Sequence, residues 1–394
     1  MEQQNGNSSS PVIRDYEQAF GEFLGPDVHA FSFWKGRIAL YAILKSLGIG
    51  PGDEVILPGY TCVVVPNAIR ATGARPVYVD ITPQNYLMEQ DFLSSAITPR
   101  TRAILVQHTY GIPAAVQQVV NLARPHGIYV IEDCAHVLGT SYQGQPLGLI
   151  GDMSFFSFQW SKPYTTALGG MAVTRSPELA GRLAQVQQEF RDPPLLAWSK
   201  LGLQLAVYNN FYSPSRYWDA KAILQHLSHL GLFVGSSSGN ELDGETPQDN
   251  NWRMSGMQAS AGRDRLQDVM QDIERRQHLQ QFYTRALLSM DWPAIECNPG
   301  TVLLRYPVRV SNKDQVLALA AARRVELGSW FETPLHPILL DMHDVFNYHL
   351  GQCPQSERAA QQVVNLPMNR WITHSEASRV VDFLVHVAHP VGPD

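Results

Sequence analysis

The 394-residue chain lacks any run of about 18 consecutive apolar residues, the length that a membrane-spanning helix needs, so the sequence excludes an integral membrane protein. It also lacks an excess of positive charge, since 30 Lys and Arg residues against 36 Asp and Glu residues give a formal net charge of −6. Nucleic-acid-binding proteins usually carry a basic face, and this balance argues against one. An anionic small ligand stays open, because a local cluster of backbone amides can bind phosphate whatever the net charge.

Cysteine is scarce: four residues, at 62, 134, 297 and 353, form no Cys-x-x-Cys pair and show no spacing of metal ligands. This spacing predicts no structural zinc site and no metal centre. The first residues have neither the basic stretch nor the apolar core of a signal peptide, and we expect residues 1–14 to be a disordered lead-in. Scattered cysteines without such a signal favour a reducing compartment, so we expect a cytoplasmic protein. The chain also lacks a Gly-x-Gly-x-x-Gly after a strand, which excludes the dinucleotide fingerprint.

What the chain does contain is an alternation of short apolar runs with stretches of helical periodicity. The runs lie at residues 54–58, 76–81, 103–106, 128–133, 154–158 and 171–174, and the helical stretches at 37–47, 63–72, 89–97 and 114–126. Runs that are apolar throughout predict an α/β fold in which helices cover a mostly parallel sheet. We expect a large domain over residues 15–250 and a smaller C-terminal α+β domain over 251–394, with a long helix at 258–285, a strand at 302–310 and a closing helix at 375–389.

Within the expected large domain, residues 191–250 have a different character. Apolar residues repeat there at helical spacing, at Leu195, Trp198, Leu201, Leu205 and Tyr208, and a stretch rich in Ser and Gly follows. We expect an apolar helical insertion and a loop. The apolar face either packs against the protein body or a second subunit, or meets a lipid-linked or bulky substrate.

Polar residues at the ends of the expected strands are the candidates for function, because ligands of parallel sheets gather at the carboxyl edge. Lys162 follows the aromatic run that ends at Phe158. Burial would lower the pKa of its ammonium group, and the neutral amine is the nucleophile that forms a Schiff base. A lysine at a strand end can equally be a solvated surface group.

Two further candidates lie at the end of the preceding apolar run. Asp133 could hold the protonated ring nitrogen of a pyridine cofactor and so keep the ring an electron sink, or it could be a helix N-cap. His136, three residues later, could be an ordinary ring that is hydrogen-bonded to the backbone. The residues alone leave these alternatives open.

Several segments occur together in an order that favours the functional interpretation of Lys162, Asp133 and His136. They include Leu47–Val55, Gly73–Asp80, Ala96–Thr101, Ile131–His136, Gly151-Asp152 with Phe156–Phe158, and Asn251–Ser255. From about Phe31 to the C-terminus, the chain resembles the DegT/StrS family of nucleotide-sugar aminotransferases, which are fold-type I enzymes dependent on pyridoxal 5'-phosphate (PLP). The resemblance implies a large PLP-binding domain, a smaller C-terminal domain and PLP as the cofactor.

The same resemblance implies roles for individual residues of this sequence. Lys162 matches the family's Schiff-base lysine, Asp133 the aspartate that pairs with the pyridinium nitrogen, and His136 a residue near the phenolic oxygen of the cofactor. The cofactor phosphate would be held by Ser157 and by the turn that opens a helix, Gly36, Arg37 and Ile38. Asn251 would reach the phosphate in the neighbouring subunit. A helix N-terminus suits this use, because its amides are unpaired and carry a partial positive charge. The implied assembly is a homodimer with shared active sites.

Three positions depart from the family's pattern. Arg37 replaces a small hydroxyl residue, and its side chain either pairs bidentately with the phosphate or points to solvent while only the amides bind. Cys62 stands where many relatives place an aromatic ring over the cofactor, and Gly256 replaces an acidic residue.

The reaction implied by the resemblance is the transfer of an amino group from an amino acid, by family habit L-glutamate, to a keto sugar on a nucleotide carrier. It would proceed by ping-pong kinetics through the Lys162 aldimine, in polysaccharide or natural-product biosynthesis. Another PLP-dependent reaction on a non-sugar substrate, such as elimination, decarboxylation or carbon–carbon bond formation, would use the same cofactor residues. Lys162 argues against a deoxygenating sugar dehydratase, which has histidine at that position, and Lys162, Asp133 and Ser157 together argue against a non-catalytic sensor.

Overall fold

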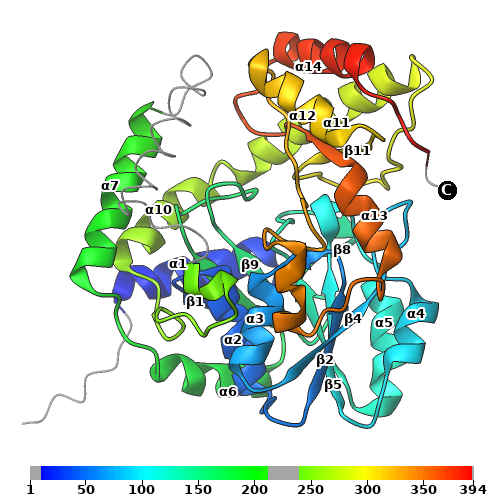
Figure 1. The fold of residues 1–394 in the computed structure, drawn as a ribbon. Helices are drawn as coiled ribbons and strands as arrows, with labels where there is room; N and C mark the ends of the chain where they lie inside the picture. The colour runs from blue at the N-terminus through cyan, green and yellow to red at the C-terminus, as the bar shows by residue number, and fades with distance from the viewer. Residues whose placement is uncertain (1–9, 212–238, 393–394) are drawn as a thin grey trace, which may run out of the picture.

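A seven-stranded sheet forms the centre of the protein, for which a computed structural model describes residues 10–211 and 239–392 (Figure 1). The strand order is β1 (His29–Phe33), β10 (Gly170–Thr174), β9 (Met153–Ser157), β6 (Tyr129–Asp133), β5 (Thr101–Gln107), β2 (Glu54–Pro58) and β4 (Arg75–Val79). All neighbouring strands are parallel except those that pair with β10. The predicted α/β fold with a mostly parallel sheet is confirmed.

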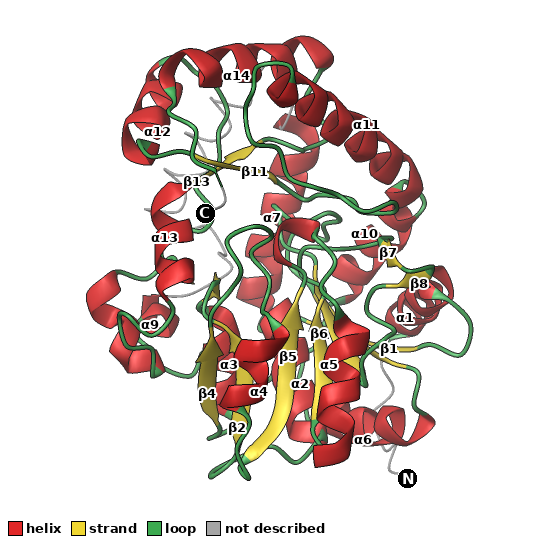
Figure 2. Cartoon of the chain, turned by 90° about the vertical axis from the view of Figure 1, so that its right-hand side faces the viewer, coloured by secondary structure: helices red, strands yellow, loops and turns green. Residues whose placement is uncertain are grey.

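Helices cover both faces of this sheet (Figure 2). Because side chains alternate along a strand, Val55 and Leu57 of β2 face one side and Ile56 faces the other. The first side packs against α2 (Gly36–Ser46), α3 (Val64–Ala71) and α6 (Pro177–Gln188), and the second against α4 (Gln90–Ala96) and α5 (Val116–Ala123). The sheet is therefore buried on both faces, which is why its strands are apolar throughout.

A smaller α+β region lies beyond one edge of the sheet. It contains the antiparallel pair β11 (Tyr306–Arg309) and β13 (Val363–Leu366), with α11 (Val269–Leu288), α12 (Lys313–Ala322), α13 (Pro354–Gln362) and α14 (His374–Val387). The expected helix over 258–285 is divided into α10 (Gly256–Leu266) and α11. Met254 and Ala259 still pack with α1 (Pro11–Leu24) of the large domain. The chain therefore stays with the large domain beyond the expected boundary at residue 250.

The N-terminal region differs from the expectation, because α1 already begins at Pro11 rather than after a lead-in of 14 residues. Proline is suited to the first turn of a helix, since its φ angle is fixed near the helical value and its missing N–H would have no helical partner. Burial of Ile13 and Tyr16 in the cluster with α10 then holds this turn.

The apolar stretch after residue 191 forms α7 (Leu195–Phe211), as its periodicity predicts. Leu201 and Leu205 are buried against the protein body, whereas Leu195, Leu196, Trp198 and Leu203 are exposed. The rest of the expected insertion and loop, residues 212–238, lies outside the described residues. Among those that are described, no helix is both long and apolar enough to cross a membrane.

Candidate active site

The predicted catalytic residues meet at the carboxyl edge of the sheet. Asp133 is the last residue of β6, and Lys162 follows the neighbouring strand β9 by five residues. The side chains of Asp133, His136 and Cys62 lie close enough to the Lys162 ammonium group for a direct electrostatic effect. Cys62 reaches the site on β3 (Thr61–Cys62), which pairs with β12 (Leu335–His336) of the smaller region.

Lys162 has the properties that a nucleophilic amine needs. Burial lowers the pKa of its ammonium group from 10.5 to about 8, against the opposing effects of Cys62 and Asp133. Its Nζ atom lies 4.9 Å from the centre of the Trp330 ring. A substantial fraction of the amine is therefore neutral near pH 8. Lys162 is half-buried and its amine lies over the Trp330 ring, so it is not a freely solvated surface lysine.

Asp133 is a buried carboxylate whose environment would favour a cationic partner. Burial raises its pKa from 3.8 to about 6, although the Ala135 amide donates a hydrogen bond to Oδ1 at 2.9 Å. A pyridinium N–H would favour the charged carboxylate and offset this effect of burial. The residues after Asp133 form a turn rather than a helix, so the alternative of a helix N-cap is wrong.

His136 is held as a neutral ring of defined tautomer. Burial lowers its pKa well below 6.5, and the Tyr110 amide donates a hydrogen bond to Nδ1 at 3.1 Å. The proton of the neutral ring therefore lies on Nε2, which becomes a hydrogen-bond donor. The ring is stacked against Trp330, with ring centres 5.6 Å apart and planes inclined by 21°.

The residues predicted to hold the cofactor phosphate lie side by side where α2 meets the end of β9. Gly36 is the first residue of α2, and a Cβ atom built on it would lie 2.7 Å from Cβ of Ser157. Only glycine lets the helix N-terminus come so close to the Ser157 hydroxyl. Together, the first amides of α2, the Ser157 hydroxyl, the buried Asp133, the half-buried Lys162 and the His136 donor fit the phosphate, ring nitrogen, aldehyde and phenolic oxygen of PLP. The predicted amide of Ile38 already donates a hydrogen bond to the Lys35 carbonyl at 3.1 Å, so its role toward the phosphate stays a prediction.

The Arg37 side chain contributes to a different structure. Its Nε atom lies 2.7 Å from Glu241 and its Nη2 atom 2.5 Å from Asp249, which also pairs with Lys35 at 2.7 Å. Burial alone would raise the pKa of Asp249, but Arg37 and Lys35 outweigh this effect and lower it. Because Arg37 is only 5% exposed, the alternative that it points to solvent is wrong. Its pairing with a phosphate stays a prediction, and any such phosphate would have to share the guanidinium with two carboxylates.

The smaller region contributes residues to the site that no sequence pattern predicts, above all Trp330 and Arg305. The Tyr110 hydroxyl donates a hydrogen bond to the Trp330 carbonyl at 2.5 Å. Lys313 donates to the carbonyls of Ser329 and Phe331 on either side, at 3.2 and 3.1 Å. Arg305 lies over the Trp330 ring, with 4.5 Å between Cζ and the ring centre. Arg305 and Trp330 follow Lys162 by more than 140 positions, and no local spacing links them to it.

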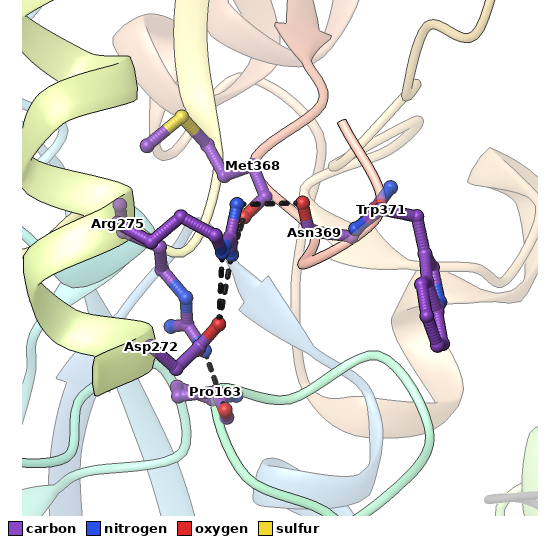
Figure 3. A network of polar contacts seen from close by, with 7 residues as sticks. Pro163, Asp272, Arg275, Met368, Asn369 and Trp371 are labelled. Atoms are coloured by element: carbon purple, nitrogen blue, oxygen red, sulfur yellow. Dashed lines mark hydrogen bonds and ion pairs between the residues drawn. The ribbon is translucent and has the colours of Figure 1, made fainter. Parts of the chain in front are cut away.

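A network around Asp272 of α11 connects the lysine loop with the smaller region (Figure 3). Asp272 accepts hydrogen bonds from Arg275, at 2.8 Å, and from Arg276. Arg276 also donates to the carbonyl of Pro163, the residue after Lys162. Arg275 donates to the carbonyls of Met368 and Asn369, at 3.0 and 2.8 Å, just beyond β13. One carboxylate therefore fixes two arginines that hold segments of the two regions.

Two other residues have no such place in the lysine site of this chain. Asn251 is exposed, and its Oδ1 atom accepts a hydrogen bond from Arg191 at 3.3 Å, so its role toward a neighbouring subunit stays a prediction. Glu132, beside Asp133, accepts hydrogen bonds from the amides of Gly148, Ile150 and Gly151 and contacts His108 at 3.2 Å. These bonds satisfy the buried carboxylate and assign it a structural role.

The fold and this site define a PLP-dependent transferase of fold type I. Comparison with known sequences makes the assignment specific. The chain belongs to the DegT/DnrJ/EryC1/StrS aminotransferase family, which matches residues 1–196 and 221–385. It is an aminotransferase, and PLP is its cofactor.

Relatives match nearly the whole chain. GDP-perosamine synthase of Caulobacter vibrioides is 28% identical over 393 residues, with 97% of this chain and 91% of the relative covered. dTDP-3-amino-3,4,6-trideoxy-alpha-D-glucose transaminase of Streptomyces venezuelae is 30% identical, with 94% and 86% covered. The crystal structure of S. venezuelae DesV is similar with a TM-score of 0.74 at 28% identity, covering 97% of this chain and 91% of that one.

Proposed function

We propose that this aminotransferase moves an amino group from L-glutamate to a keto sugar carried on a nucleotide, in the cytoplasm. The relatives named above are a GDP-sugar synthase and a dTDP-sugar transaminase, which supports an acceptor of this class. The observation that carries the proposal is the half-buried Lys162, with a pKa of about 8, beside Asp133 and His136. Four free cysteines are consistent with a reducing compartment.

The residues of the chain have separate tasks in this reaction. Bound PLP supplies an electron sink for the charge that proton removal leaves on a substrate carbon. Lys162, partly neutral near pH 8, would be the base that takes that proton and, once protonated, the acid that gives it up to the carbon on the other side of the amino nitrogen. The Asp133 carboxylate keeps the ring nitrogen protonated, and Nε2 of His136 donates a hydrogen bond to the ring oxygen. Ser157 and the N-terminal amides of α2 hold the phosphate.

The test uses the PLP-loaded protein and two successive substrates. We expect L-glutamate alone to bleach the cofactor absorbance and release one equivalent of 2-oxoglutarate. Subsequent addition of a nucleotide-linked keto sugar should restore the absorbance and yield an amino sugar, identified by mass. Such a two-step exchange predicts parallel double-reciprocal plots. Failure of every amino acid to bleach the cofactor would refute transamination, and bleaching without any aminated sugar would refute the acceptor class.

We further propose that the active enzyme is a homodimer in which Asn251 completes the partner's site. Asn251 is exposed, in a turn before α10, where a neighbouring subunit could approach it. Inactive Lys162→Ala chains mixed with impaired Asn251→Ala chains should regain part of the activity, because one site of each mixed dimer has both groups. A monomer at working concentration, or no recovery after demonstrated chain exchange, would contradict shared sites.

A further inference from the structure

Two tyrosines follow neighbouring strands at the carboxyl edge of the sheet. Tyr60 comes just after β2, and Tyr110 lies in the turn Thr109–Gly111 after β5. Because β2 and β5 pair in parallel, their carboxyl ends bring the two hydroxyl oxygens together, 2.7 Å apart. Both side chains are fully buried, so each hydroxyl has to find its hydrogen-bond partners inside the protein.

The other partners of these hydroxyls are the two polar groups of one peptide bond in the smaller region, between Trp330 and Phe331. The Tyr110 hydroxyl donates to the Trp330 carbonyl at 2.5 Å, and the Phe331 amide donates to the Tyr60 hydroxyl at 3.2 Å. Since Tyr110 uses its proton on that carbonyl, Tyr60 donates its own proton to Tyr110. The tyrosine pair therefore clamps this peptide group at both its carbonyl and its amide.

The clamped peptide carries the Trp330 ring, which contacts two predicted functional residues. The ring centre lies 5.6 Å from that of His136 and 4.9 Å from Nζ of Lys162. Tyr110 also holds His136 directly, because its backbone amide donates to Nδ1 at 3.1 Å. Tyr110 has a φ of 59°, in the left-handed region that a bulky residue seldom adopts unless its surroundings fix it. A single residue of the large domain thus orients two rings of the lysine site.

We propose that Tyr60 and Tyr110 are positioning residues, whose hydroxyls act on the reaction by holding the Trp330 ring against His136 and Lys162. The inference rests on the proposed function, in which Lys162 moves a proton and His136 donates a hydrogen bond to the ring oxygen of the cofactor. Both tasks depend on direction, because hydrogen bonds weaken steeply when donor and acceptor are misaligned. A phenylalanine in place of either tyrosine keeps the ring in the core and removes only the clamp.

The first test measures the clamp itself in the cofactor-free protein, by hydrogen–deuterium exchange. Tyr60→Phe should speed exchange of the Phe331 amide at least about tenfold, because that amide loses its acceptor. Tyr78→Phe is the matched control: its hydroxyl also donates to a carbonyl of the smaller region, that of Phe346 at 2.8 Å, but from the edge strand β4. It should leave the Phe331 amide unchanged. Equal exchange at Phe331 in the parent and in Tyr60→Phe would overturn the clamp.

The second test asks whether the Tyr110 hydroxyl acts through the Trp330 ring. In single turnovers with L-glutamate, Tyr110→Phe should lower the rate of cofactor bleaching at saturation about fivefold to tenfold and change the half-saturating concentration less than about twofold. In a Trp330→Ala background the same change should hardly lower the rate further, yet its cost in the free energy of unfolding should persist, because the hydroxyl binds the backbone carbonyl. Trp330→Phe, which keeps a ring, should preserve the effect on the rate.

An equal fall in rate with and without the Trp330 ring would show that the Tyr110 hydroxyl does not act through it, and an unchanged saturating rate in Tyr110→Phe would overturn the positioning role. If no amino acid bleaches the parent, transamination with such a donor fails instead. The same variants are then compared by the rate at which the cofactor-free protein captures PLP on its lysine. Capture by Tyr110→Phe as fast as by the parent would overturn the positioning of Lys162.

Discussion

Two buried charged regions lie at the carboxyl edge of the same sheet and differ in how their charges are matched. In one, Lys35 and Arg37 at the start of α2 pair with Asp249 and Glu241. In the other, Lys162 faces the Trp330 ring beside Asp133. Burial lowers the pKa of both Lys35 and Lys162 to about 8. A shifted pKa therefore does not by itself identify a catalytic lysine. The Lys162 amine lies over the Trp330 ring at 4.9 Å, whereas the amine of Lys35 lies 2.7 Å from a carboxylate oxygen of Asp249.

The comparison predicts that only one of these lysines reacts with the cofactor. Lys162→Ala should reduce turnover by at least about a thousandfold, since the group lost is both nucleophile and base. Borohydride reduction of the PLP-loaded parent, followed by peptide mapping, should place the adduct on Lys162 and leave Lys35 unmodified. Lys45→Ala is the control, because Lys45 is an exposed lysine that pairs with Glu189. An adduct on Lys35 would show that pairing does not protect an amine of equal pKa.

Substitutions in the paired cluster of Lys35, Arg37, Asp249 and Glu241 should change the stability of the protein. Arg37→Met removes a partner of Glu241, whose side chain is fully buried, and we expect a loss of about 3–5 kcal/mol in the free energy of unfolding. Arg37→Met combined with Glu241→Leu should recover much of that loss, because the fully buried carboxylate of Glu241 is gone and Asp249 keeps its pair with Lys35. Arg182→Met, which breaks an exposed pair with Glu178, should cost less than about 1 kcal/mol. Denaturant titration measures all three, and equal losses in the single and double variants would contradict charge matching as the cause.

At the lysine site, the ionisation of Asp133 should make the free energy of unfolding of the cofactor-free protein depend on pH. The pKa of Asp133 is about 6 in the folded protein against an ordinary value of 3.8, so its ionisation destabilises the fold as pH rises from about 4 through 6. Asp133→Asn should therefore stabilise the cofactor-free protein by about 1–3 kcal/mol at pH 8 and by almost nothing at pH 4. Thermal or denaturant unfolding at both pH values checks this. A gain that is the same at pH 4 and pH 8 would rule out ionisation as its source.

Local sequence patterns predict the structural features that residues close together in the sequence determine, such as the strands and the residues that follow them. The buried strands are visible as apolar runs, because both faces of the sheet are covered, and Lys162 and Asp133 follow two such runs. The sequence pattern places Arg37 on a phosphate or in solvent, because its actual partners, Glu241 and Asp249, lie some two hundred residues later. Trp330 is likewise brought to Lys162 by the packing of the smaller region, which no spacing in the chain records. Pairings across such distances depend on the folded chain as a whole.

The double use of the Asp272 carboxylate has a mechanical consequence. Through Arg276 it holds the peptide after Lys162, and through Arg275 the chain beyond β13. The hydrogen bonds form a chain, so the lysine loop is joined to this network through a single bond, from Arg276 to the Pro163 carbonyl, which is worth about 1.5–3 kcal/mol because its donor is charged. Loss of the Asp272 carboxylate would therefore loosen both attachments at once, because neither arginine would keep the partner that orients its guanidinium.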